Sequence, residues 1–149
     1  MDDYMFSQTT EYALRVVVYL ASRGKQPATN REISKATHVP QGYLAKILQT
    51  LSRGGLVQSQ RGLHGGSILR RDPAKLTLLD VISIVDPLKR IEACPLSLTW
   101  HGRNLCPLHR RIDDAISKVE HILGTAYISE LLVGKTAKSL PLCTVKERK

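Results

Sequence analysis

The sequence has no long apolar run, although hydrophobic residues make up 42% of its 149 residues. A transmembrane helix needs about 20 consecutive apolar residues, so we expect none and no membrane partner. The opening residues MDDYMFSQ are acidic and lack a basic segment followed by an apolar core, which predicts no secretory signal. We therefore expect a cytoplasmic protein.

Cysteine is scarce, and the motifs of common enzymes are missing. The three cysteines are an odd number, which argues against a disulfide framework and leaves thiol reactivity or metal binding. The stretch GLHGG does not stand between a strand and a helix, as a phosphate-binding loop would. No nucleophile and base, and no pair of acids, are placed for catalysis. We expect a protein that is not an enzyme.

Positive charge is in excess and is unevenly distributed. Lysine and arginine number 22 against 13 acidic residues, a formal charge of +9. Residues 1–75 hold 11 basic and 5 acidic side chains, and residues 76–149 hold 11 and 8. The excess in the first half is spread over short elements and turns, not along one amphipathic helix. It therefore favours a nucleic-acid partner over a membrane surface.

Capping signals and apolar spacing predict three helices near the N-terminus. The first begins after Ser7 and stops at Gly24. The second begins at Asn30, because Thr29 and Glu32 have the spacing of a capping box. The third follows Pro40 and has an apolar stripe formed by Leu44, Ile47, Leu48 and Leu51. Its opposite face carries Gln41, Lys46, Gln49, Thr50 and Arg53.

A glycine-rich stretch after the third helix predicts a β-hairpin, or wing. In GGLVQSQRGLHGGSILRRDP, short extended segments flank a turn that needs positive backbone angles. TLLDVISIVD then predicts a fourth helix, capped by Thr77 and ended at Pro87. The expected fold is mainly α with a small β wing, a winged helix-turn-helix domain.

The second half predicts a loop, a long helix and a tail. The loop contains Cys94, Trp100 and Cys106 among proline and glycine and shows no regular period. A near-heptad apolar seam from Leu108 onward requires a partner helix, so we expect a homodimer. The expected organisation is a DNA-binding domain at 1–87, a sensor loop at 88–107, a dimerisation helix region at 108–133 and a basic flexible tail at 134–149, where Cys143 is incidental.

A third helix with a polar outer face, beside a flexible turn, suits the grooves of duplex DNA. Such a helix fits the major groove, while Arg61 and His64 at the hairpin tip suit a narrow minor groove with concentrated negative potential. A helical domain that binds no DNA, or that docks on protein as an interaction module, remains the alternative for this pattern.

Four segments give a closer comparison: TEYALRVVVYLA, VPQGYLAKILQTLSRGGLV, SQRGLHGGSIL and LTLLDVISIVD. They closely resemble the Rrf2 family of bacterial winged-helix transcriptional regulators, and the resemblance covers nearly the whole chain apart from the tail. It implies a sequence-specific repressor that binds an inverted repeat as a dimer. It places Gln41, Lys46 and Gln49 at or near base-contacting positions and Arg61 at the minor-groove position. Arg31 is expected to hold phosphate.

The loop cysteines suggest a metal centre. His109 follows Cys106 by three residues on one helical face, so two thiolates and an imidazole can converge. In cluster-binding relatives the resemblance matches Cys94 and Cys106 to the first and third of three cysteines, and Trp100 stands near the missing middle one. Some relatives complete the site with a histidine matching His109 or with an acid matching Glu11 of the other subunit.

The resulting hypothesis is an iron-sulfur cluster, with the two-iron, two-sulfur type favoured. Its ligands would be Cys94, Cys106 and one or two of His109, Glu11 and His101. Zinc is the rival, because two cysteines and two histidines also suit a tetrahedral site. A third alternative is a metal-free regulator that responds to a small molecule or a partner protein.

Overall fold

A computed structural model describes residues 5–97 and 104–132 of the chain. His101, Trp100, Cys143 and the expected tail lie outside the described residues. Among the described residues, no helix is both long and apolar enough to cross a membrane. The elements are α1 (Gln8–Ser22), α2 (Asn30–Thr37), α3 (Gln41–Arg53), β1 (Val57–Gln60), β2 (Gly66–Leu69), α4 (Leu78–Val85), α5 (Pro107–Thr125) and α6 (Ile128–Leu132).

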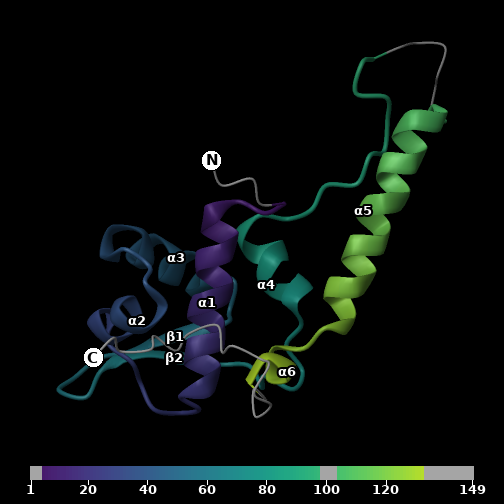
Figure 1. Cartoon of the computed structure of the whole chain (residues 1–149). Coiled ribbons are helices and arrows are strands. Elements are labelled where there is room, and N and C mark those ends of the chain that lie inside the picture. The colour runs from purple at the N-terminus through teal and green to yellow at the C-terminus, as the bar shows by residue number, and fades with distance from the viewer. Residues whose placement is uncertain (1–4, 98–103, 133–149) are drawn as a thin grey trace, which may run out of the picture.

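Helix α1 is the centre of the core. In Figure 1 it stands upright, with α2 and α3 on one side and α4 and α5 on the other. Its apolar face is fully buried at Ala13, Val16 and Val17. The stripe predicted for α3 also points inward, with Leu44 and Leu51 fully buried. Burial of such side chains contributes about 1.5–3 kcal/mol each, which makes this shared apolar face the main source of stability.

The predicted ends of α1 and the predicted start of α2 are confirmed. The Ser7 hydroxyl accepts a hydrogen bond from the Thr10 amide at 3.3 Å. Gly24 follows α1 with a φ of +61°, in the left-handed region that glycine favours after a helix. The Glu32 carboxylate accepts a bond from the Thr29 amide at 2.8 Å, which completes the capping box and lowers the pKa of Glu32.

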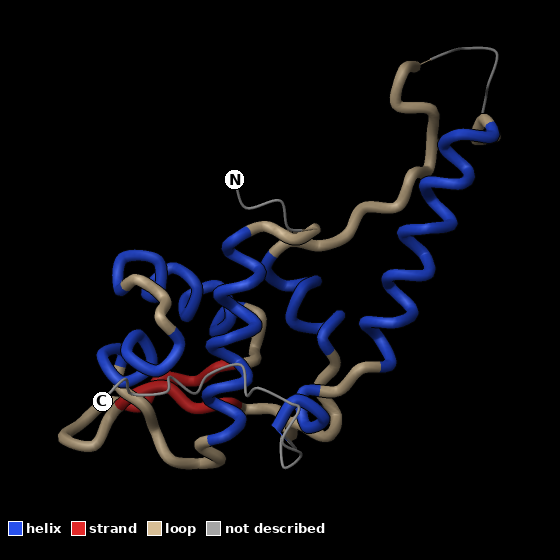
Figure 2. The backbone as a smooth tube through the Cα atoms, in the orientation of Figure 1, coloured by secondary structure: helices blue, strands red, loops and turns tan. Residues whose placement is uncertain are grey.

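The predicted wing is an antiparallel hairpin (Figure 2). Strand β1 pairs with β2 so that Val57 lies opposite Leu69 and Ser59 lies opposite Ser67. Ser67 also bonds the backbone of Ala28 in both directions, at 2.8 and 3.0 Å, which attaches the wing to the segment before α2. Sequence periodicity did not predict this bridge, because a single extended residue has no repeat.

The long helix is shorter than expected. It ends at Thr125, so the dimerisation region predicted for residues 108–133 is not one continuous helix. The chain after it returns to the winged core, where the Ile128 amide bonds the Leu76 carbonyl and the Ala126 carbonyl accepts from the Leu78 amide. Ile128 of α6 is fully buried. Burial of this apolar residue and pairing with the strand-like segment before α4 therefore stop the helix.

Helix α5 projects away from this core (Figure 1). None of its 19 residues is buried. Three large apolar side chains stay notably open to solvent: Leu108 at 64%, Ile112 at 42% and Ile122 at 64%. The apolar seam predicted from the sequence therefore lies on a helix that the described residues leave largely uncovered.

Candidate nucleic-acid interface

Helix α3 turns its polar face outward. Gln41, Lys46 and Gln49 are exposed, whereas Leu44 and Ile47 on the other side are buried. The helix begins directly after Pro40, which has no side-chain cap. Gln41 thus stands at the start of a helix whose outward side presents hydrogen-bonding groups to a partner.

The aromatic residue beside this face is more open than its neighbour. The amphipathic pattern of the helix points Leu44 inward and leaves Tyr43 at the boundary, and in the structure Leu44 is fully buried while Tyr43 is 53% exposed. The Tyr43 ring meets the edge of Tyr12 from α1 at a centroid distance of 6.0 Å. Tyr43 therefore packs at the rim, with its other side in solvent.

The wing tip presents the two predicted cationic or titratable side chains. Arg61 and His64 are both exposed, and Leu63 between them is 98% exposed. Gly62 has a φ of +118° and its carbonyl accepts the Gly65 amide at 2.9 Å, which makes the turn tight. A narrow tip with a guanidinium can enter a minor groove.

A polar hollow of about 360 Å³ lies between α3 and the wing. Arg31, the predicted phosphate ligand, is exposed. It is the second residue of α2 and directly follows Asn30, which lines the hollow. The hollow is lined by Asn30, Ala45, Leu48, Gln49, Ser52, Arg53, Ser59 and Ser67. Sequence reasoning placed Arg53 on the polar face of α3 but assigned no role to it or to the serines. The sequence alone could not predict that the strand register places Ser59 opposite Ser67.

The structure brings two of the predicted metal ligands together. Cys106 is the N-cap of α5, and its Sγ lies 3.2 Å from Nδ1 of His109. The His109 amide also donates to Sγ at 3.5 Å. Cys94 is 9% exposed. Within the part of the chain that is described, no group of three or more histidine, cysteine, aspartate or glutamate side chains is placed to hold a metal ion.

Glu11 lies in the first turn of α1, a separate element from the cysteine pair. Its carboxylate is 3.7 Å from Nε of Arg15, one helical turn away. A single described chain therefore supplies the Cys106–His109 pair but not a complete set of four ligands. His101 lies outside the described residues, so its contribution stays a prediction.

An ion-pair clasp holds the start of the cysteine loop against α5. Two nitrogens of Arg90 bond the two oxygens of Asp113 at 2.6 and 2.7 Å, and the Ile91 amide adds a third bond at 2.9 Å. Arg90 also reaches Glu120 at 3.4 Å. The hydrogen bonds that Arg90 donates lower the pKa of Asp113 to about 2, and the same bonds, accepted by the Asp113 carboxylate, raise the pKa of Arg90.

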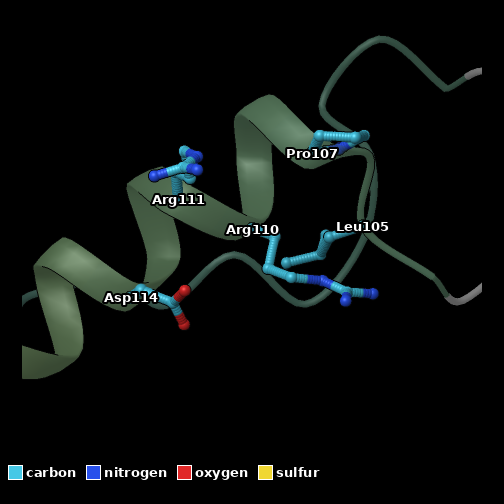
Figure 3. Close-up of a pocket in the computed structure, with 5 residues that line it drawn as sticks. All are labelled: Leu105, Pro107, Arg110, Arg111 and Asp114. Carbon is cyan, nitrogen blue, oxygen red and sulfur yellow. The ribbon is translucent and has the colours of Figure 1, made fainter.

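A second hollow, of about 520 Å³, lies at the first turn of α5, next to Cys106 in sequence. Figure 3 shows its lining, with Arg110 extended beside Leu105 and with Asp114 one turn further along the helix. Pro107 and Arg111 complete it. Two guanidinium groups against one carboxylate make this end of α5 attractive to anions.

The helical core, the outward polar face of α3 and the adjoining hairpin define a winged helix-turn-helix protein. The family model for Rrf2, described as an iron-dependent transcriptional regulator, matches residues 6–134. The chain therefore belongs to the Rrf2 family, which confirms the resemblance found in the sequence. It is a DNA-binding transcriptional regulator and not an enzyme.

Individual relatives agree with the family. An HTH-type transcriptional regulator of Aquifex aeolicus is 30% identical over 131 residues, 86% of this chain and 91% of the relative. The regulator IscR of Xenorhabdus nematophila is 28% identical over 122 residues, 81% of this chain and 74% of the relative. The solved structure of CymR, called the global cysteine regulator of B. subtilis, has a TM-score of 0.72 at 23% identity. It covers 87% of this chain and 96% of CymR, and it confirms the fold.

Proposed function

We propose that the chain represses transcription in the bacterial cytoplasm by binding an inverted DNA repeat as a homodimer. Helix α3 of each subunit would enter a major groove, where Gln41 and Gln49 suit adenine edges and Lys46 suits guanine. Arg61 and His64 would enter the neighbouring minor groove, and Arg31 would hold phosphate. The observation that carries this proposal is the exposure of all these side chains on α2, α3 and the adjoining wing.

Helix α5 is the proposed dimer contact. Its exposed apolar side chains, with Leu108, Ile112 and Ile122 the most open, would be covered by the same helix of a second copy. A two-fold axis through this contact would place a second copy of α3 and the wing on the DNA. Dimers of this class present their two recognition helices about 34 Å apart, one turn of duplex.

Capture of genomic DNA tests the proposal directly. Purified protein mixed with sheared genomic fragments should enrich a set that shares an inverted repeat, with affinity that falls as salt rises. Lys46→Ala and Arg61→Ala should each weaken the enrichment. Lys118→Ala on α5 also removes one positive charge, but far from α3 and the wing along the chain, and it should leave the enrichment unchanged. Equal recovery of all fragments by every variant would refute sequence-specific binding.

We further propose that the cysteine loop is the sensor. The contact between Cys106 and His109 favours a metal centre, as does the iron-dependent description of the family. The candidate ligands are Cys94, Cys106 and one or two of His109, His101 and Glu11 of a second copy. An iron-sulfur cluster there would supply one-electron redox chemistry, and zinc is the alternative occupant.

Cys106 couples this site to the dimer helix. Its sulfur accepts the His109 amide and so stabilises the first turn of α5. A change in what the Cys106 sulfur binds would therefore alter the first turn of α5, the proposed dimer contact. Such a change alters DNA affinity only if the two sensor states differ in their affinity for DNA.

Anaerobic purification tests the sensor. The expected result is visible absorbance with iron and acid-labile sulfide, lost in Cys106→Ala and retained in Cys143→Ala, the matched control. Zinc without sulfide would assign the site to zinc. Absence of every metal after attempted reconstitution, with DNA binding unaltered by Cys94→Ala, would reject a metal centre.

The hollow beside Cys106 favours one second candidate, a metal-free regulator that binds a small anion. Arg110 and Arg111 line it, and CymR of B. subtilis, whose fold this chain shares, is called a cysteine regulator. Calorimetric titration of metal-free protein with small carboxylates, compared with Arg110→Gln, separates this candidate from the metal centre. No heat with any anion would remove it.

A further inference from the structure

The hollow between α3 and the wing is lined by polar side chains from four elements, α2, α3, β1 and β2, beside Ala45 and Leu48 of α3. Asn30 is the first residue of α2, Ser52 and Arg53 end α3, and Ser59 and Ser67 face one another across β1 and β2. Directly opposed residues of a hairpin project from the same face, so both serine side chains belong to one wall. The volume of about 360 Å³ leaves room for a tetrahedral oxyanion.

The hydroxyl of Ser67 has no hydrogen-bond partner within the described chain. Ser67, at 3% exposure, is one of three buried polar residues in the described ranges. The other two are satisfied, since the Thr37 hydroxyl donates to the Ile33 carbonyl at 2.7 Å and Thr10 bonds Ser7 at 3.1 Å. Among the described residues, the only buried side-chain nitrogen or oxygen atom without a hydrogen-bond partner is Nε of Arg23, so the Ser67 hydroxyl stays open to the hollow and can donate a hydrogen bond there. An external acceptor would pair the Ser67 hydroxyl.

Among the described residues that line this hollow, Arg53 is the only one with a charged side chain. It is exposed, and none of the carboxylates in the described ranges pairs with it. The side chains of Asn30, Ser52 and Ser59 likewise make no hydrogen bond to another described residue. A free guanidinium, an amide and hydroxyl donors without a competing carboxylate are the groups that bind phosphate.

Duplex geometry identifies the phosphate. The major and minor grooves of B-DNA share one phosphodiester strand as their common wall. A protein that places α3 in the major groove and the wing tip in the adjoining minor groove must straddle that strand, and the hollow lies between these two elements. We propose that the hollow binds a backbone phosphate of this strand, with Arg53 as the cation and Ser59, Ser67 and Asn30 as further donors.

This inference rests on the proposed function and adds a site to it. The bound phosphate fixes how deeply α3 and the wing sit, while carrying no sequence information itself. Arg53 is then a positioning residue, distinct from Gln41 and Lys46, which read bases. The two kinds of contact respond differently to substitution, and this difference makes the site testable.

Binding titrations at several salt concentrations separate the two kinds of contact. On a captured genomic fragment and on a scrambled duplex, Arg53→Gln should weaken binding by about tenfold for each subunit bound, with the ratio between the two duplexes unchanged. The plot of log affinity against log salt should become shallower by about one for each subunit. Ser59→Ala should weaken binding severalfold with the slope retained, and Lys118→Gln serves as the charge control.

A chemically altered duplex locates the phosphate. Neutral methylphosphonate is placed singly at each backbone position between the bases read by α3 and those at the wing. One position should weaken binding of the wild type by about tenfold yet add nothing to the defect of Arg53→Gln. The two losses should multiply at every other position.

The outcomes are distinct. The phosphate site is overturned if Arg53→Gln binds DNA as Lys118→Gln does, or if it changes the ratio of affinities for the specific and scrambled duplexes. It is also overturned if every methylphosphonate position weakens binding of Arg53→Gln as much as it weakens binding of the wild type. Failure of the wild type to bind any duplex at low salt would instead refute the proposed function. Circular dichroism of Arg53→Gln should match the wild type, because this side chain is exposed.

Discussion

At the scale of single residues, Lys46 and Arg53 lie seven positions apart on α3 and we assign them different tasks. Lys46→Ala is expected to cost about 1–3 kcal/mol of discrimination at one base pair, because a guanine edge loses its donor. Competition between the captured fragment and single-base variants measures this. The substitution should flatten the preference at one position only. A uniform loss over all duplexes would instead make Lys46 a phosphate contact.

Asp113 gives the protein a pH-dependent contact. Its pKa is lowered to about 2 from the ordinary 3.8 because Arg90 donates two hydrogen bonds to its ionised form. The stabilisation is therefore complete above pH 3.8 and is lost as the pH falls through about 2. We expect Asp113→Asn to melt at a lower temperature than the wild type at neutral pH, with the difference closing toward pH 2.

Thermal melts from pH 6 to pH 2, followed by circular dichroism, check this expectation. Asp114→Asn is the matched control, since Asp114 is the next residue on α5 and makes no ion pair with another described residue. A constant difference between Asp113→Asn and the wild type over the whole range would contradict the clasp. High salt should weaken the effect, because the pair is partly open to solvent.

At the scale of elements, Gly66 controls how closely the wing approaches the core. A methyl group there would come within 2.5 Å of the Ala28 carbonyl oxygen, which is held by the Ser67 amide. Gly66→Ala is therefore expected to lower the free energy of unfolding by about 1–3 kcal/mol. Urea denaturation measures it, and DNA affinity should fall as the wing shifts.

Gly42→Ala is expected to stabilise the protein, in contrast to Gly66→Ala. A methyl group at Gly42 meets no atom within 4 Å, and its backbone is helical. Removing glycine from a helix should raise the free energy of unfolding by about 0.5–1 kcal/mol. Equal effects of the two substitutions in the same urea experiment would show that the Ala28 contact does not control the wing.

Most of the helices and strands could be predicted from signals local in the sequence. The capping residues Ser7, Thr29 and Thr77 act within four residues of chain, so their sequence spacing is enough to predict them. The same holds for Cys106 and His109, which meet because they lie one helical turn apart. The remaining candidate ligands lie on other segments or on another copy, and spacing along the chain carries no information about their distance.

At the scale of the whole molecule, the exposed seam of α5 predicts an obligate partner. Ile122→Glu should convert the proposed dimer into a monomer, because burying an unpaired carboxylate in an apolar contact is costly. Sedimentation velocity at micromolar concentration measures the change. The winged domain should stay folded, since Ile122 is 64% exposed in the single chain.

The matched control for this experiment is Leu63→Glu. Leu63 is 98% exposed at the wing tip, so the same apolar-to-acidic change there should leave the oligomeric state unaltered. If Ile122→Glu sediments as the wild type does, α5 is not the dimer contact. The inverted-repeat geometry would then need another two-fold interface.

The amino-acid sequence alone determined the winged helix-turn-helix class, the outward polar face of α3 and the glycine turn of the wing, because each depends on neighbours a few residues apart. Only the tertiary structure decided where α5 stops, how Ala28 joins the wing, and that Arg90 clasps Asp113. It also decided that Arg53, Ser59 and Ser67 share one hollow. These features arise from contacts between segments distant along the chain, and packing and burial, not local periodicity, determine which segments meet.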